Sequence, residues 1–251
     1  MINRTNLLNE LRDLLKILEA DLLARSESDQ VPEVVQALAD EYEKAKQAER
    51  TALSFEDWRN DFNTQMAAAW VLSCVFVRFL EDNQLLEHPQ ISGPGDRLQW
   101  ARDQHQVYFT NNPTESDREY LLKIFGEIRD LSHGAAGDVF GKHNFIWQLP
   151  NWISGDAASE LLKFFRTINP DDGMLIHDFT NPDWDTRFLG DLYQDLSLHA
   201  RKKYALLQTP DFVEEFILDR TLWNRHSMSL VWKQSRSRTN KAMRSPTKAF
   251  G

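Results

Sequence analysis

Histidines and carboxylates are the residues of this chain that could bind a metal ion. His133 and His143 flank a glycine-rich stretch, and His177 is followed directly by Asp178. Neither place supplies a full ligand set: no His-Glu-x-x-His is present and no carboxylate is in phase with the first histidine pair. A single cysteine, Cys74, excludes an internal disulfide and a zinc or iron–sulfur cage built from cysteines. We predict no metal site.

A second oxygen-rich stretch resembles the start of a calcium loop. Asn181, Asp183 and Asp185 would fill its first, third and fifth positions. Thr186 replaces the required glycine, and Leu192 replaces the bidentate glutamate at the end of the loop. These carboxylates are better explained as caps, which accept hydrogen bonds from free N–H groups at a helix start.

Loops that bind phosphate and strained nucleophile turns are missing from the sequence. The glycine pairs Gly93/Gly95 and Gly134/Gly137 match neither a P-loop nor a dinucleotide fingerprint. No Gly-x-Ser-x-Gly is present to hold a hydrolase nucleophile. The sequence therefore predicts no catalytic residue in this chain.

Apolar residues recur every three or four positions along most of the chain, which is typical of amphipathic helices. The pattern predicts a mainly α, multi-helix domain with long aromatic-rich loops and no substantial sheet. One short extended piece is expected at Met174–Ile176. We predict helices over Thr5–Ala24, Pro32–Arg50, Ser54–Asp82, Asp96–Phe109, Ser116–Leu131, Ser154–Ile168, Trp184–Lys203 and Thr209–Leu222.

Local signals mark several helix starts and faces. Pro32 suits a first helical turn, and Ser54 is followed three residues later by Asp57, which resembles a capping box. The second helix should bury a face that includes Val35 and Leu38. The third is apolar nearly all round in its second half, so we expect it to be the central core helix, with Cys74 as an inert buried thiol.

Charge is distributed unevenly along the 251 residues, whose formal net charge is −9. The last 29 residues contain seven Lys or Arg and no acid, so all 38 acidic residues lie before them. An acidic body argues against a surface that binds nucleic acid throughout. The tail could be a nucleic-acid-binding arm, a disordered end, or sequence read in a shifted frame. Its basic residues are Arg225, Lys233, Arg236, Arg238, Lys241, Arg244 and Lys248.

These observations divide the chain into four predicted parts. They are a helical hairpin over 1–50, a helical body over 51–208, a single helix over 209–222, and a basic, disordered tail over 223–251. The most apolar run, Met66–Val77, is far shorter than the ~20 residues that span a bilayer. The start of the chain has no apolar signal segment. We expect a cytoplasmic protein without a membrane segment.

Several segments resemble a known family. They include Ala68–Leu72, Phe76–Asn83, Gln148–Pro150 with Ser154–Asp156, Trp184–Ser197 and Tyr204–Val213. Together they resemble the amino-terminal region of the PglX family, the adenine-specific DNA methyltransferases of BREX phage-defence systems. The likeness covers about residues 1–222.

The resemblance implies a cofactor and partners. Family members transfer a methyl group from S-adenosylmethionine to adenine, so DNA and other BREX proteins are the implied partners. Thr209 and Pro210 resemble the family's motif X, which opens a helix beside the cofactor pocket. A helix start with free N–H groups suits the carboxylate of that cofactor.

Two family motifs are missing from this sequence. One is the Asp-Pro-x-Cys-Gly-Ser-Gly cofactor loop, and the other is the Asn-Pro-Pro-Tyr or Asn-Pro-Pro-Phe motif that holds the flipped adenine. Asn181–Trp184 only superficially resembles the second motif. We therefore expect a truncated methyltransferase that binds no cofactor and is inactive alone. The alternatives are an accessory module that binds defence proteins or, through its tail, DNA, and a regulator that competes for the methyltransferase's partners.

Overall fold

The computed structural model describes residues 4–131, 139–180, 187–196 and 213. The chain divides into two units, Met1–Leu206 and Leu207–Gly251, and nearly all described residues belong to the first. These described residues are mainly helical and contain no β-strand, which confirms the predicted fold class. Their helices are α1 (Arg4–Ser26), α2 (Pro32–Gln47), α3 (Phe55–Asp82), α4 (Asp96–Asn111), α5 (Asp117–Leu131), α7 (Gly155–Arg166) and α8 (Arg187–Leu196), with a 3-10 turn, η1 (Phe145–Trp147).

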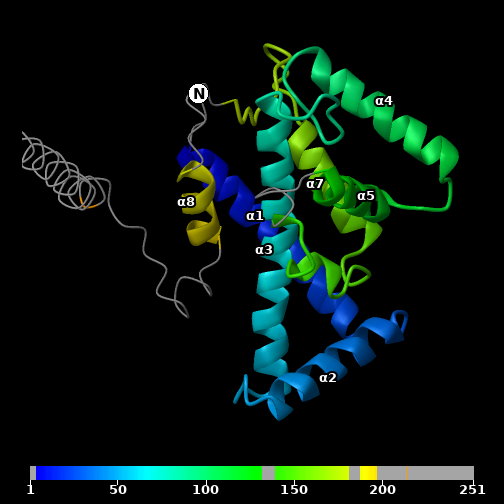
Figure 1. Cartoon of the computed structure of the whole chain (residues 1–251), viewed down its shortest axis with the longest axis vertical. Coiled ribbons are helices and arrows are strands. Elements are labelled where there is room, and N and C mark those ends of the chain that lie inside the picture. Colours follow the sequence, from blue (N-terminus) through cyan, green and yellow to red (C-terminus); the bar gives the residue numbers. More distant parts are fainter. Residues whose placement is uncertain (1–3, 132–138, 181–186, 197–212, 214–251) are drawn as a thin grey trace, which may run out of the picture. The chain divides into compact units, whose positions relative to one another are not determined.

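The long helix α3 is the centre of the first unit. It contacts α1, α2, α7, α8 and η1, and Figure 1 shows it upright in cyan with α1 beside it. Met66, Trp70 and Cys74 are completely buried on α3, so the predicted central core helix is confirmed. Burial raises the pKa of the Cys74 thiol far above its ordinary value, which leaves this cysteine unreactive.

The same helix is long and apolar enough to cross a membrane by composition alone. However, 72% of its most apolar window is buried inside the fold. α3 is therefore a core helix of a folded domain, because its apolar side chains already pack against other helices.

The helix starts follow their predicted capping residues. Pro32 occupies the first turn of α2. The Ser54 hydroxyl accepts a hydrogen bond from the Asp57 N–H and donates one to the Asp57 carboxylate, and the Ser154 hydroxyl caps α7 by accepting from the Ala157 N–H. The predicted starts of these three helices are confirmed. Each cap fixes the residue at which its helix begins.

The buried face of α2 differs from the prediction by one residue. Val34 is 2% exposed and Leu38 is completely buried, whereas Val35 is 37% exposed. Val34 and Leu38 are one turn apart and lie on one stripe, and Val35 is rotated about 100° away from it. The prediction that Val35 faces the core was wrong. The end of this helix at Gln47 is also earlier than the predicted Arg50.

Two connections complete the core. The aromatic-rich loop before α7 buries Phe140 against Phe125, with ring centroids 5.3 Å apart, and the Trp152 indole donates to the Leu22 carbonyl at 2.7 Å. After α7, an isolated antiparallel bridge joins Ile168 and Leu175 in the region where a short extended piece was predicted. α8 lies within the predicted helix Trp184–Lys203, whose two ends fall outside the described residues.

Candidate functional site

The site residues predicted from the sequence lie outside the described part of the chain. This applies to Thr209 and Pro210, to the Asn181–Thr186 stretch, and to His133. It also applies to every basic residue of the tail: Arg225, Lys233, Arg236, Arg238, Lys241, Arg244 and Lys248. Their proposed roles in binding cofactor or DNA therefore stay predictions.

The His177–Asp178 pair is described, and its histidine packs as a structural residue. The His177 ring stacks on Phe164 with centroids 4.4 Å apart, and Nε2 lies 2.9 Å from a Glu10 carboxylate oxygen. Burial, aided by the positive charge of Arg78, lowers the pKa of His177 to about 4. Burial therefore favours the neutral form of this imidazole. Among the described residues no group of three or more His, Cys, Asp or Glu side chains could hold a metal ion.

The most polar part of the core is a buried ion pair near the end of α3. The side chains of Arg78 and Asp82 are both completely buried, and their closest nitrogen and oxygen atoms are 2.8 Å apart. The guanidinium also donates to the carbonyls of Phe165 at 2.6 Å and His177 at 3.0 Å. Asp82 in turn accepts from the Phe179 N–H at 2.8 Å. The pair therefore fastens the segment after α7 to α3.

Glu81, next to this pair, binds the backbone of a different segment, that of Gln90–Ser92. Its completely buried carboxylate accepts hydrogen bonds from three successive backbone N–H groups, those of Gln90, Ile91 and Ser92, at 2.5–3.0 Å. Burial raises the pKa of Glu81 to about 7, although these three donors and Arg78 oppose the shift. Glu81 is thus saturated with structural partners within its own fold.

These charged residues belong to the Phe76–Asn83 segment that carries part of the family resemblance. We did not predict their structural role. A signal for it exists in the sequence, because three charged residues at positions 78, 81 and 82 lie within three or four residues of each other on an otherwise apolar helix. Charges placed this way in a core must be paired.

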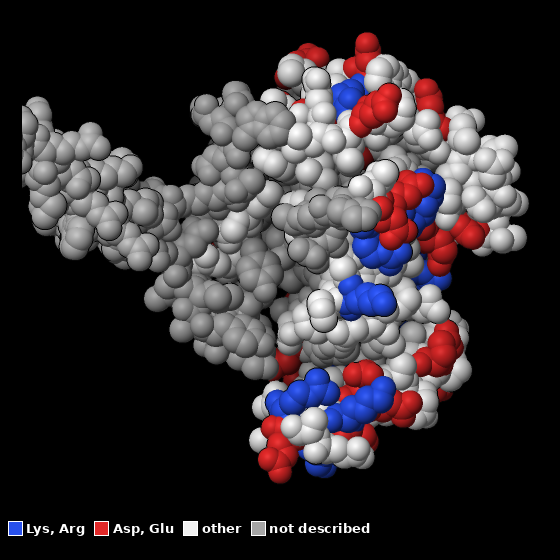
Figure 2. All heavy atoms as spheres, viewed as in Figure 1, with Lys and Arg blue, Asp and Glu red and all other residues white. Residues whose placement is uncertain are grey.

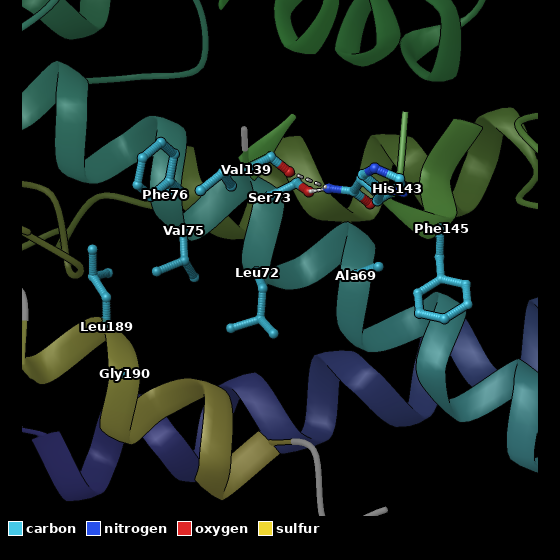
Figure 3. A pocket seen from close by; sticks show the side chains of 11 residues that line it. Ala69, Leu72, Ser73, Val75, Phe76, Val139, His143, Phe145, Leu189 and Gly190 are labelled. Carbon is cyan, nitrogen blue, oxygen red and sulfur yellow. Dashed lines mark hydrogen bonds between the residues drawn. The ribbon is translucent and has the colours of Figure 1, made fainter. Parts of the chain in front are cut away.

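A hollow bordered by described residues lies along α3. It has a volume of about 590 Å³ and is lined chiefly by apolar side chains of α3, including Leu72 and Phe76, together with Val139, Phe145 and Leu189. Figure 3 shows Leu72 pointing from α3 into the space toward α8. Its polar groups are few, and the Asn144 amide already donates to the Ser73 hydroxyl and the Val139 carbonyl. No described carboxylate lines the hollow.

A second hollow, of about 400 Å³, follows the same helix toward its start. It is lined by Trp58, Asp61 and Gln65 of α3, by Arg50, and by Phe145, which also lines the first hollow. The two hollows are therefore neighbours along one helix face.

Charged side chains on the described surface are mixed in sign. On the face shown in Figure 2, lysines and arginines alternate with aspartates and glutamates, and no continuous basic patch forms there. Several of these charges pair with each other, as Lys123 does with Glu127 at 2.8 Å. Mixed pairs of this kind give no field that would attract a DNA backbone.

Comparison with known proteins identifies a relative by sequence. No protein-family model and no solved structure matches the chain. Over 232 residues, 88% of the chain, the sequence is 45% identical to the adenine-specific methyltransferase PglX of Streptomyces coelicolor. The chain spans 18% of the length of that protein. The resemblance expected from the sequence is therefore confirmed: this chain is similar to part of PglX, an adenine-specific methyltransferase.

Proposed function

We propose that the chain forms a helical, non-catalytic part of a PglX-type adenine-specific DNA methyltransferase. The observation that carries this proposal is 45% identity over 232 residues to the Streptomyces coelicolor protein. The whole enzyme would methylate adenine in DNA, in the cytoplasm, as part of a BREX phage-defence system. The helical unit would support the catalytic region, which supplies the chemistry.

The 590 Å³ hollow along α3 is a poor match for S-adenosylmethionine. That cofactor carries an ammonium group and ribose hydroxyls, which carboxylate oxygens bind well. This hollow is lined chiefly by apolar side chains and has no described carboxylate in its lining. The buried carboxylates Glu81 and Asp82 already bind backbone N–H groups and Arg78. We therefore propose no cofactor site in this hollow or at these two buried carboxylates.

Isothermal titration calorimetry tests the non-catalytic role. The purified chain should show no saturable heat with S-adenosylmethionine at millimolar concentration, where the Streptomyces coelicolor protein serves as the positive control. Saturable binding to the chain alone would contradict the proposal and would return Thr209 and Pro210 to the centre of a cofactor site.

A chimera tests the link to the methyltransferase. Deleting the matching segment from the Streptomyces coelicolor protein should abolish adenine methylation, and inserting residues 1–222 of this chain in its place should restore it. The readout is N6-methyladenine in plasmid DNA, measured by mass spectrometry. If the deleted protein methylates DNA as well as the parent does, the helical unit has no supporting role.

A second function, DNA binding by an accessory module, is favoured by the basic tail. Seven Lys or Arg and no acid fall within 223–251. Binding through them should weaken steeply with salt, with a slope of about −6 in log K against log salt if all seven contact phosphates. Gel-shift assays of the full chain and of residues 1–222 test this idea. DNA binding that survives the deletion would rule out a tail arm.

A further inference from the structure

The isolated bridge after α7 joins two short extended segments, Thr167–Asn169 and Met174–Ile176. On the second segment the Met174 carbonyl and the Ile176 N–H bond to the first segment, at 2.7 and 3.0 Å. Successive residues of an extended chain direct their backbone groups to opposite edges, so the N–H and carbonyl of Leu175 point away from the first segment. Neither group has a hydrogen-bond partner among the described residues. We call this free backbone edge the Leu175 edge.

The Leu175 edge faces a hollow of about 340 Å³. One wall of this hollow is the run Met174–Phe179, and Leu7 and Glu10 of α1 contribute to the other. The segment Thr167–Asn169, which is bonded to the opposite edge, does not line it. The unpaired N–H and carbonyl of Leu175 are therefore on the side of the hollow, which lies between an extended backbone and a helix.

The segments that form the bridge also expose apolar side chains. Met174 is 62% exposed, Ile176 is 49% exposed, and Ile168 on the paired segment is 41% exposed. An extended edge with unpaired backbone groups and apolar side chains is a ready template for pairing with another chain. The Leu175 edge has both features.

The charged side chains described in the lining of this hollow are all acidic. They are Glu10, Asp172 and Asp178, and none of them pairs with a described lysine or arginine. The partner of Glu10 is His177, whose neutral form is favoured because burial lowers its pKa to about 4. Asp172 and Asp178 accept hydrogen bonds from nearby backbone N–H groups, which carry no net charge. The three carboxylates therefore lack a compensating cation.

We propose that this hollow binds an extended, lysine- or arginine-containing segment of a partner protein, which adds as a strand to the Leu175 edge. The backbone of the partner would pair with the N–H and carbonyl of Leu175, and its basic side chains would meet the three carboxylates. In strand addition, main-chain hydrogen bonds give affinity and alternate side chains give specificity. This inference goes beyond the function proposed above and does not depend on it.

An extended basic peptide fits these residues better than a metal ion or DNA. The carboxylates flank the Leu175 edge, with Asp172 before Met174 and Asp178 after Ile176, and no group of three described acids or histidines could hold an ion. Uncompensated carboxylates repel the phosphates of DNA. Cations spaced along a peptide can reach carboxylates that are spaced along the hollow.

Isothermal titration calorimetry of the full chain with short peptides tests the proposal. The probe is Lys-Thr-Val-Thr-Lys, acetylated and amidated at its ends, and the control peptide is Glu-Thr-Val-Thr-Glu with the same ends. We expect saturable binding of the basic peptide and affinity lower by about tenfold or more for the acidic one. No saturable binding of the basic peptide at millimolar concentration, or equal affinity for both peptides, would overturn the proposal.

Charge-neutralising variants test whether the peptide binds in this hollow. Glu10→Gln combined with Asp178→Asn keeps the size of both side chains and should weaken binding of the basic peptide by about tenfold. The matched control combines Glu43→Gln with Asp40→Asn, which removes the same charge from exposed positions on α2 and should leave the affinity unchanged. Equal weakening by both pairs would show attraction to net charge alone and would overturn the proposal.

Backbone methylation of the basic peptide tests strand addition itself. A strand directs alternate N–H groups toward its neighbour, so N-methylation either of the valine or of both threonines should block binding, and the other pattern should not. If both methylated peptides bind as tightly as the parent, the backbone of the peptide does not pair with the Leu175 edge, and the proposal is wrong.

The basic tail of the chain is the rival occupant. In a full-length variant, the seven Lys and Arg of residues 223–251 are replaced by Gln. The proposal predicts the same peptide affinity for this variant as for the natural chain. Binding that is tighter by about tenfold in the variant would overturn the proposal in favour of the tail.

Discussion

All three guanidinium nitrogens of Arg78 donate hydrogen bonds inside the core. Its planar guanidinium binds the Asp82 carboxylate with two nitrogens and still reaches the carbonyls of Phe165 and His177. Rings of Phe165 and Phe179 lie 5.9 and 5.3 Å from the guanidinium carbon. Lysine could not reproduce this geometry, because its ammonium is a single point charge without the fork.

Removing this guanidinium should destabilise the fold severely. We expect Arg78→Met to lower the free energy of unfolding by about 3–5 kcal/mol, since it leaves the Asp82 carboxylate buried without a counter-charge and removes the donor to two carbonyls. The matched control is Arg129→Met. Arg129 pairs with Asp130 at the surface, so its loss should cost at most about 1 kcal/mol. Urea denaturation measures both, and similar losses would contradict the structural role of Arg78.

His177 should make stability depend on pH. Its folded-state pKa of about 4 is below the ordinary 6.5, so the unfolded chain binds the proton more readily between these values. The contribution of the neutral His177 ring to the free energy of unfolding is fully present above pH 6.5 and is lost as the pH falls toward 4. The loss should be on the order of 3 kcal/mol.

His177→Phe should remove this contribution, because the ring still stacks on Phe164 but no longer titrates. Glu81, whose pKa is raised to about 7, acts in the opposite direction in both proteins, so the readout is the difference in unfolding free energy between wild type and His177→Phe, which should change by this amount across the range. His88→Phe, which changes an exposed imidazole, should keep the wild-type profile. Thermal unfolding followed by circular dichroism from about pH 4 to 7.5 gives the comparison. A His177→Phe profile parallel to that of the wild type would show that burial does not shift this pKa.

Single-residue roles were the least accessible from the sequence. The capping roles of Ser54 and Ser154 could be predicted, because a cap depends on residues within one turn of itself. The spacing of Arg78, Glu81 and Asp82 signals that they are paired, but the partners of Arg78 could not be predicted, because they lie up to 99 residues away along the chain. Only the folded arrangement brings these backbone groups to α3.

Elements were predicted better than residues, and their starts better than their ends. α3 begins where Ser54 caps it, and the predicted end at Asp82 is also correct. α2 ends three residues before its predicted limit. No glycine or proline follows the helix, so its end could not be placed accurately from the sequence. The apolar period also allowed either Val34 or Val35 on the buried face, and packing against α1 and α3 selected Val34.

The end of α3 offers a stabilising change. Gln84 follows the helix with φ of +58°, and the Leu85 N–H reaches back to the Leu80 carbonyl at 2.9 Å. This left-handed position strongly favours glycine. We expect Gln84→Gly to stabilise the protein by about 1 kcal/mol.

The same substitution inside a helix should have the opposite sign. Gln106 is exposed in the middle of α4, and Gln106→Gly should cost about 1 kcal/mol. Chemical denaturation of the two variants gives both values. If Gln84→Gly is as destabilising as Gln106→Gly, the φ at Gln84 is not left-handed in solution.

At the scale of the whole molecule, the described core belongs to the first unit. Its buried apolar residues run from Leu7 to Leu196, and all of them precede the division at Leu206. The resemblance to PglX could be predicted from the sequence, because a few motifs sufficed to carry it. The hollows along α3 could not be predicted, because the pattern shows that the second half of this helix is apolar nearly all round but not which face other helices leave open.

A fragment of residues 1–206 should therefore fold by itself. We expect cooperative unfolding with a free energy within about 1 kcal/mol of that of the full chain, since every described core residue is retained. Far-ultraviolet circular dichroism with urea tests this expectation. A fragment that unfolds without cooperativity would show that the core depends on residues after 206.

The carboxylates near the end of α3 also govern how this fold opens to water. The Phe179 N–H donates to Asp82, and the Ile91 and Ser92 N–H groups donate to the adjacent Glu81. Freeing any of them locally would cost a buried carboxylate one of its hydrogen-bond donors, so these two connecting segments should open less readily than loops elsewhere do. Their amide protons should exchange with solvent as slowly as those of α3 itself, which makes two irregular segments and one helix a single cooperative unit.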